Sequence, residues 1–264
     1  MKKIMALSVL ALASAANAQA LFNGSPIVQN FDTLPSQGTV PALSATTGLQ
    51  ISLNTHLSVT SLDGWQVAKI GGSGTSPMPF AVDAGSNISG GIFSYGAVGS
   101  SERALGSLAS GSNVPAFGVW IQNSAAFSIT EFTVSFDAEA WRSSTSQVNT
   151  LAFAWGTSGG TITSANFLSD ATLTAFAAGD IVGPAPVTSN GPLNPPTVTS
   201  VSFTVTGLNV APGESIFLRW QDVNETGNDA GLAIDNFNFS AVPTPGTMAL
   251  LGMGGLVAAR RRRA

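Results

Sequence analysis

The stretch Ile129-Thr-Glu-Phe-Thr-Val-Ser-Phe-Asp-Ala-Glu-Ala-Trp141 decides the fold class. Apolar side chains stand at every second position from Phe132 to Ala140, and mostly polar or charged side chains stand between them. Because successive side chains of a β-strand point to opposite faces, this alternation predicts a strand with one face in a core and one toward solvent. Trp141 continues the polar face.

Comparable patterns recur along the chain, separated by Gly-rich or Pro-rich turns. His56 is expected inside a strand within residues 49–62. Gly183–Pro196 contains five prolines and is expected to be a loop. Many short strands without an amphipathic helix or a long repeat are typical of a single antiparallel β-sandwich or jelly roll. The further strands are expected within residues 49–62, 65–70, 88–95, 116–122, 151–155, 198–206, 216–220 and 232–239.

The charge of the chain is unevenly distributed. Six of the ten basic residues lie in the first three or the last five positions, which leaves four basic residues against fourteen acidic ones between them, a formal charge of −10. An acidic body of this kind repels nucleic acid. The chain has no cysteine and one histidine, His56, which excludes Cys–His nucleophiles and the usual zinc sites.

The two ends of the chain have the composition of export signals. Lys2 and Lys3 precede an apolar run, and Ala16-Asn17-Ala18 offers a signal peptidase site, so residues 1–18 are expected to be a signal peptide helix. At the other end, the apolar stretch Thr247–Ala259 would span about 20 Å as a helix. A bilayer core is about 30 Å thick, so this stretch fits a transient membrane contact better than a permanent anchor.

The tail, residues 242–264, resembles the PEP-CTERM sorting signal, which some naming schemes call an ice-binding-protein C-terminal domain. Its motif, apolar helix and basic end are matched here, although Thr244 stands where the signal usually has Glu. The resemblance implies an exosortase-like sorting enzyme and transient attachment to the inner membrane. The implied destination is the cell surface or extracellular matrix of a Gram-negative-type bacterium. The matching residues are Pro243, Thr244, Pro245, Gly246, Arg260, Arg261, Arg262 and Arg263.

Between these ends, residues 19–241 are expected to form one β-sandwich ectodomain. The segments 101–108, 138–142, 216–222 and 231–237 resemble uncharacterised β-sandwich ectodomains of secreted bacterial proteins. That resemblance points to a fold and not to an activity.

The polar face of the quoted strand is one candidate site. Asp137 and Glu139 are about 7 Å apart on it, and Trp141 follows. An aromatic ring beside acids on a sheet can hold a sugar by stacking and hydrogen bonding, so polysaccharide is a candidate ligand. Two carboxylates at this spacing also fit a glycosidase, and a solvated polar face is the third reading. The remaining tryptophans are expected in the core or near turns: Trp65, Trp120, Trp155 and Trp220.

The oxygen-rich segment 222–235 is a second candidate site. Its oxygen density suits a hard cation, which makes Ca²⁺ the only candidate cofactor, and a polar hairpin is the alternative. Ala233 stands where an EF-hand needs its Glu, which excludes that motif. The candidate calcium ligands are Asp222, Asn224, Asp229, Asp235 and, from the N-terminal part, Asp32.

We therefore expect an exported, non-enzymatic binding or structural protein. The alternatives are a carbohydrate-active enzyme that uses Asp137 and Glu139, and a purely structural coat protein.

Overall fold

The computed structural model describes residues 19–243 of the 264-residue chain. The expected signal peptide, residues 1–18, lies outside the described residues. So does the sorting signal beyond Pro243. Within residues 19–243, no helix combines the length and the apolar character needed to cross a bilayer.

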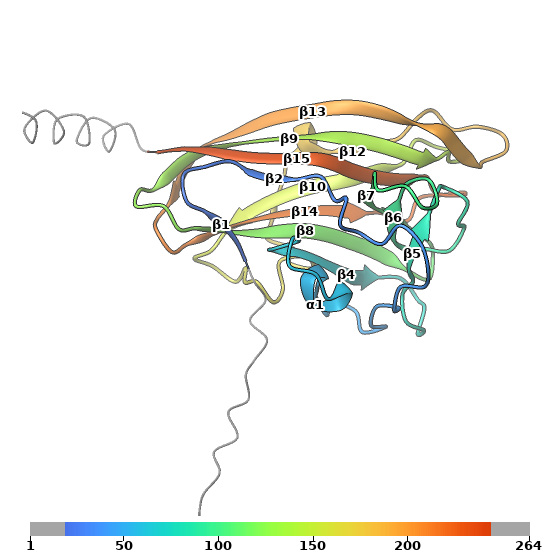
Figure 1. The fold of residues 1–264 in the computed structure, drawn as a ribbon, viewed down its shortest axis with the longest axis horizontal. Coiled ribbons are helices and arrows are strands. Elements are labelled where there is room, and N and C mark those ends of the chain that lie inside the picture. The colour runs from blue at the N-terminus through green and yellow to red at the C-terminus, as the bar shows by residue number, and fades with distance from the viewer. Residues whose placement is uncertain (1–18, 244–264) are drawn as a thin grey trace, which may run out of the picture.

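Two β-sheets pack face to face, which confirms the predicted β-sandwich (Figure 1). The first sheet has the order β11 (Thr174–Ala175), β10 (Thr150–Thr157), β14 (Ser215–Asp222), β8 (Val114–Asn123), β4 (Trp65–Gly71) and β3 (Ile51–Ser52). In addition, β1 (Ala20–Phe22) pairs with β8 and β12 (Ile181–Val182) pairs with β10.

The second sheet has the order β13 (Pro192–Val210), β9 (Ile129–Arg142), β15 (Gly231–Pro243), β7 (Ala104–Leu108), β6 (Gly91–Tyr95) and β5 (Phe80–Asp83). The short β2 (Ile27–Gln29) pairs with β15. Figure 1 shows β13, β9 and β15 side by side along the upper part of the molecule. We call the side of this sheet that faces away from the first sheet its outer face.

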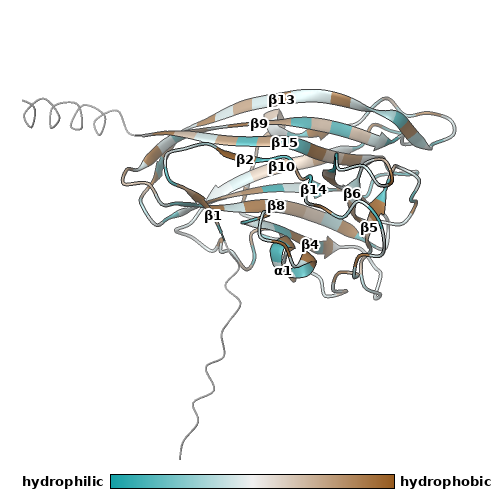
Figure 2. Ribbon diagram, viewed as in Figure 1, coloured by the Kyte–Doolittle hydropathy of each residue, from teal (hydrophilic) through white to brown (hydrophobic). Residues whose placement is uncertain are grey.

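The core lies between the two sheets and is rich in aromatic rings. Trp220 on β14 is fully buried and contacts Trp65, Phe136, Phe153 and other rings at centroid distances of 5.0–6.3 Å. Alternation along β9 supplies the second sheet's share of this core, as predicted, and Figure 2 shows the matching change of hydropathy along the strands. Of the tryptophans expected in the core or near turns, Trp65 and Trp220 are buried, whereas Trp120 and Trp155 are half-buried.

Three local expectations were wrong. His56 lies in the short helix α1 (Leu53–Leu57) and not in a strand; its ring stacks on Phe80 at 5.7 Å. The expected loop Gly183–Pro196 ends early, because β13 already begins at Pro192 on the edge of its sheet, where a residue without an N–H is tolerated. The sandwich is also not wholly antiparallel, since β1 runs parallel to β8 and β5 runs parallel to β6.

The last strand contains an irregularity that changes which side chains face the core. Between Asp235 and Asn238 the register of β15 against β9 shifts, and Asn236 adopts a positive φ of 49°. Leu232 and Ile234 face the core before the shift, and Phe237 and Phe239 face it afterwards. The strand continues to Pro243, two residues beyond the expected end of the ectodomain.

Candidate functional site

The outer face of the second sheet brings together the three residues predicted to bind a ligand. Asp137, Glu139 and Trp141 follow one another at alternate positions of β9, which is an interior strand of its sheet. Strand β13 lies on one side of them and β15 on the other. At about 3.3 Å per residue, Asp137 and Trp141 are about 13 Å apart along the strand.

Trp141 is held in one orientation. Its indole N–H donates a hydrogen bond of 2.6 Å to Oε2 of Glu139. Its ring lies parallel to that of the buried Tyr95, with the ring centroids 5.9 Å apart and the planes inclined by 6°. The side chain remains half-buried, so part of it faces solvent. This arrangement fixes an aromatic ring at the surface before any ligand arrives.

Glu139 holds the indole of Trp141 in place through this hydrogen bond and has little contact with solvent. Only 9% of the residue is exposed. Burial raises its pKa, the hydrogen bond from Trp141 lowers it, and Glu102 and Asp137 raise it further by charge repulsion.

Asp137 borders a shallow groove. Its Oδ1 accepts a hydrogen bond of 2.8 Å from Ser200 on β13, and its Oδ2 accepts one of 3.0 Å from Asn236 on β15. The groove has a volume of about 250 Å³, and Ser135 and Ser202 add hydroxyl groups to its wall. Hydroxyl, amide and carboxylate groups from β9, β13 and β15 therefore line a surface depression.

Asp235, predicted from the sequence as a calcium ligand, lies on this face instead. It stands opposite Asp137 in the β15–β9 register and is 1% exposed. Its Oδ1 has no hydrogen-bond partner. Burial raises its pKa to about 8, and interactions with Glu102 raise it as well. Asp235 is therefore largely uncharged at neutral pH, which reduces the repulsion among the neighbouring carboxylates.

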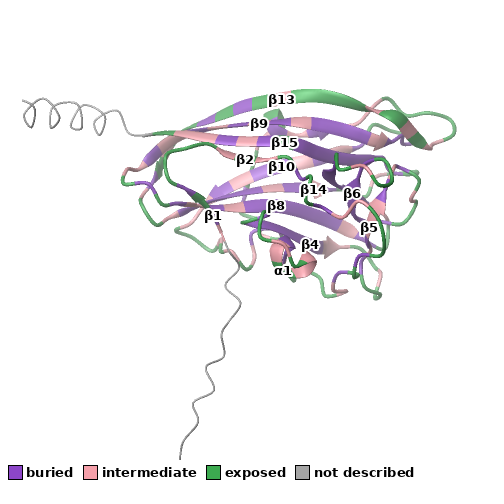
Figure 3. Cartoon of the chain, in the orientation of Figure 1, coloured by how far each residue is buried: buried purple, intermediate pink, exposed green. Residues whose placement is uncertain are grey.

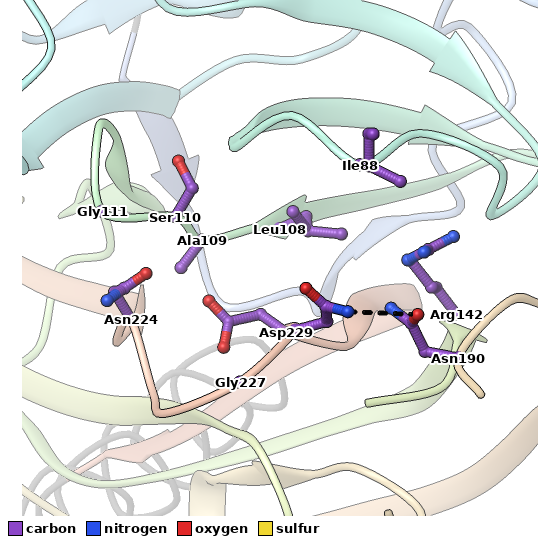
Figure 4. A pocket seen from close by; sticks show the side chains of 11 residues that line it. Ile88, Leu108, Ala109, Ser110, Gly111, Arg142, Asn190, Asn224, Gly227 and Asp229 are labelled. Carbon is purple, nitrogen blue, oxygen red and sulfur yellow. Dashed lines mark hydrogen bonds between the residues drawn. The ribbon is translucent and has the colours of Figure 1, made fainter. Parts of the chain in front are cut away.

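The loop that follows β14 borders a separate pocket (Figure 4). This pocket has a volume of about 300 Å³ and is lined by polar side chains that include Asn224, Asp229 and Arg142. Burial raises the pKa of Asp229 to about 7, and the charge of Glu225 adds to the effect. The Asp229 carboxylate also accepts a hydrogen bond of 3.3 Å from the backbone N–H of Glu225.

The structure does not bring the five predicted calcium ligands together. Asp222 points between the sheets, where it accepts a hydrogen bond of 2.8 Å from Ser107. Asp235 lies on the outer face of the second sheet, and Asp32 is exposed and bonded to Asn30. Only Asn224 and Asp229 share the loop pocket. Among residues 19–243, no three His, Cys, Asp or Glu side chains are grouped so that they could hold a metal ion.

The separation of these residues has a physical reason. Leu232 to Asp235 already belong to β15 of the second sheet, whereas Asp222 ends β14 of the first sheet. Residues close in sequence are therefore divided between two layers of the sandwich.

No protein-family model and no curated protein matches this chain. Solved structures that resemble it include the CBM22-1 xylan-binding domain of Paenibacillus barcinonensis Xyn10C. The two sequences are 12% identical, the match covers 86% of this chain and 99% of that chain, and the TM-score is 0.34. The enzymatically active domain of tailspike protein 4 of bacteriophage CBA120 has 15% identity over 68% of this chain and 19% of that chain, with a TM-score of 0.31.

TmCBM61 in complex with β-1,4-galactotriose has 10% identity over 55% of this chain and 74% of that chain, with a TM-score of 0.30. At this level of similarity the three structures assign neither a ligand nor an activity to this chain.

Proposed function

We propose that this protein is an exported, non-catalytic carbohydrate-binding protein that holds polysaccharide on the outer face of its second sheet. The observation that carries the proposal is the pair formed by Trp141 and Glu139, which fixes an aromatic ring on the same face as a groove lined with hydroxyl and amide groups. The ring lies about 13 Å along β9 from Asp137, which borders that groove.

The chemistry of this face suits a sugar. The C–H faces of a sugar pack on an aromatic ring, and its hydroxyl groups exchange hydrogen bonds with hydroxyl, amide and carboxylate side chains. A ring that is already immobilised loses little conformational entropy on binding. The acidic body repels anionic polymers, so neutral polysaccharides are the expected class.

The hydrogen bonding of the two carboxylates favours binding over catalysis. A glycosidase needs one carboxyl group that reaches the glycosidic oxygen and a second that reaches the anomeric carbon or a water. Here Oε2 of Glu139 bonds Trp141, and both oxygens of Asp137 bond neighbouring side chains. The enzymatic alternative predicts release of reducing sugar, and the proposed binding function predicts none.

Export is the second half of the proposal and is supported by the composition of the two ends of the chain. The N-terminus of the protein isolated from the producing bacterium tests it. The expected first residue is Gln19, because the signal peptidase site ends at Ala18. Isolation of a chain that still begins at Met1 would contradict export by this route.

A polysaccharide screen tests the binding function directly. The protein is applied to xylan, galactan, alginate and the matrix polysaccharide of the producing bacterium, with Ca²⁺ and again with a chelator, and reducing sugar is measured in parallel. We expect a neutral polymer to bind in both conditions without hydrolysis. No binding to any polymer would overturn the proposal in favour of a structural coat protein, and hydrolysis would overturn it in favour of an enzyme.

A further inference from the structure

Strand β13 has one edge without a partner. It pairs with β9 in an unbroken register from Thr197 to Thr206, and in the described part of the chain no other strand pairs with it. In an antiparallel pair, alternate residues direct their N–H and C=O groups away from the partner strand. A row of such groups therefore lies open along β13, most of which is exposed (Figure 3).

This edge lacks the features that usually prevent edge-to-edge pairing. Natural edge strands are protected by charged residues, above all Lys, by proline and by bulges. None of the 19 residues of β13 is charged. Pro195 and Pro196 precede the regular segment, and a register shift follows Thr206, so both protective irregularities lie at its ends. The segment 197–206 itself is unprotected.

We infer that the segment Thr197–Thr206 is an interface at which a second copy of this chain pairs with the first, strand against strand and antiparallel. A body with a formal charge of −10 opposes most modes of self-association. When the β13 edges of two copies pair, no charged side chain of β13 faces the other copy, so the pairing adds no charge repulsion within the two strands. Its outer row consists of small hydroxyl and β-branched side chains, which pair favourably across antiparallel strands: Val198, Ser200, Ser202, Thr204 and Thr206.

The symmetry of such a pair has a consequence for the proposed sugar face. Directly opposed residues of antiparallel strands point to the same side of the sheet. A two-fold axis perpendicular to the sheet therefore leaves both outer faces on one side. The groove wall already includes Ser200 and Ser202 of β13, so the two grooves would flank the axis. If the proposed function holds, the pair presents two sugar sites to one polymer and gains avidity.

The area that the two strands can bury limits the strength of this association. A ten-residue edge pairing buries less than the roughly 1,600 Å² of a standard interface, so we expect a weak dimer. Sedimentation velocity of the protein without any polysaccharide, from about 10 µM to about 1 mM, is the measurement. The weight-average mass is expected to rise toward that of a dimer, and the amides of residues 197–206 are expected to exchange more slowly at the higher concentrations.

Opposite charges at one position give the decisive variants. Ser202→Lys and Ser202→Asp each place like charges across the pair and are expected to remain monomeric, whereas an equal mixture of the two is expected to restore the dimer. Val98→Lys, at a loop residue that is 80% exposed, is the matched control and should associate like the parent protein.

If the protein associates through another part of the chain, substitutions of Ser202 should not change its association. A parent protein that stays monomeric at every concentration, or a dimer that Ser202→Lys leaves intact, would overturn the inference. Either result leaves the sugar-binding proposal standing, because that proposal is measured separately by polysaccharide binding.

Discussion

Glu139 lies two positions before Trp141 on β9 and accepts a hydrogen bond of 2.6 Å from the indole N–H of Trp141. A buried carboxyl group thereby orients a half-buried aromatic ring. The hydrogen bond gives a buried acid, 9% exposed, a structural partner, and it assigns Glu139 to the support of the proposed binding surface and not to direct contact with a ligand.

The role of Glu139 as a positioning residue predicts a mild effect of Glu139→Gln. The amide oxygen of Gln can still accept the indole N–H, and the buried site no longer holds an ionisable group. We expect polysaccharide affinity to fall by less than about threefold, a free-energy change below about 0.7 kcal/mol. Glu139→Ala removes the acceptor and should weaken binding more. Equal losses in the two variants, measured by isothermal titration calorimetry, would show that the charge itself contacts the sugar.

The buried acids predict that the protein is most stable in mild acid. Burial raises the pKa of Asp235 to about 8 and of Asp229 to about 7, whereas an unfolded Asp titrates near 3.9. Between these values the folded protein holds more protons than the unfolded chain, so the free energy of unfolding decreases as pH rises. The stabilisation is complete below about pH 4 and is lost as pH passes the folded-state values.

Thermal melts at pH 5 and pH 8.5 check this directly, and the melting temperature should be lower at pH 8.5. Asp235→Asn should reduce the difference, because the amide stays neutral, by at most about 1.4 kcal/mol per pH unit. A melting temperature that rises with pH would contradict the proposed protonation of these groups.

Gly85 packs closely against the backbone at the Trp141 end of β9. Its φ is +90°, and a Cβ atom would overlap the carbonyl oxygen of Trp141. We expect Gly85→Ala to lower the free energy of unfolding by more than about 2 kcal/mol. Gly99→Ala is the matched control, since Gly99 has a φ of +77° but open space around its Cβ position. It should cost about 1 kcal/mol by strain alone. If urea denaturation shows that the two variants lose the same free energy of unfolding, the close contact between Gly85 and Trp141 does not contribute to stability.

The loop after β14 is stabilised by protein groups. Asn149 donates to Oε2 of Glu225 at 2.9 Å and accepts the backbone N–H of Ala230 at 2.5 Å. Asn149→Ala leaves these groups without their partner and should destabilise the protein by about 1–3 kcal/mol. Chelator should not change the melting temperature of the parent protein. A decrease on chelation that Ca²⁺ reverses would restore the calcium hypothesis for Asn224 and Asp229.

Period-two alternation was sufficient to predict β9 and the common face of Asp137, Glu139 and Trp141, because side-chain direction along a strand is a local property. Asp235 could not be assigned to that face. Its position depends on the register between two strands about a hundred residues apart and on the shift beside Asn236. A signal was present in the sequence: the spacing of three between Ile234 and Phe237 breaks the alternation of β15.

The placement of His56 illustrates the same limit. Two apolar residues at alternate positions on either side of it fit a strand, yet Leu53–Leu57 forms one helical turn. Short apolar runs do not distinguish the two structures, and tertiary packing decides between them. Similarly, the prolines at the start of β13 read as a loop, because the sequence does not show that this strand lies on an edge.

Calorimetric titration of the best-binding polysaccharide from the screen into Trp141→Ala, Trp141→Phe and the parent protein tests the central claim most directly. Trp120→Phe, a half-buried tryptophan on the other sheet, is the control. The account predicts that Trp141→Ala loses at least about tenfold in affinity, about 1.4 kcal/mol, that Trp141→Phe retains part of it, and that Trp120→Phe binds like the parent protein. Parent-like affinity in a folded Trp141→Ala variant would contradict the assignment of the outer face as the binding surface.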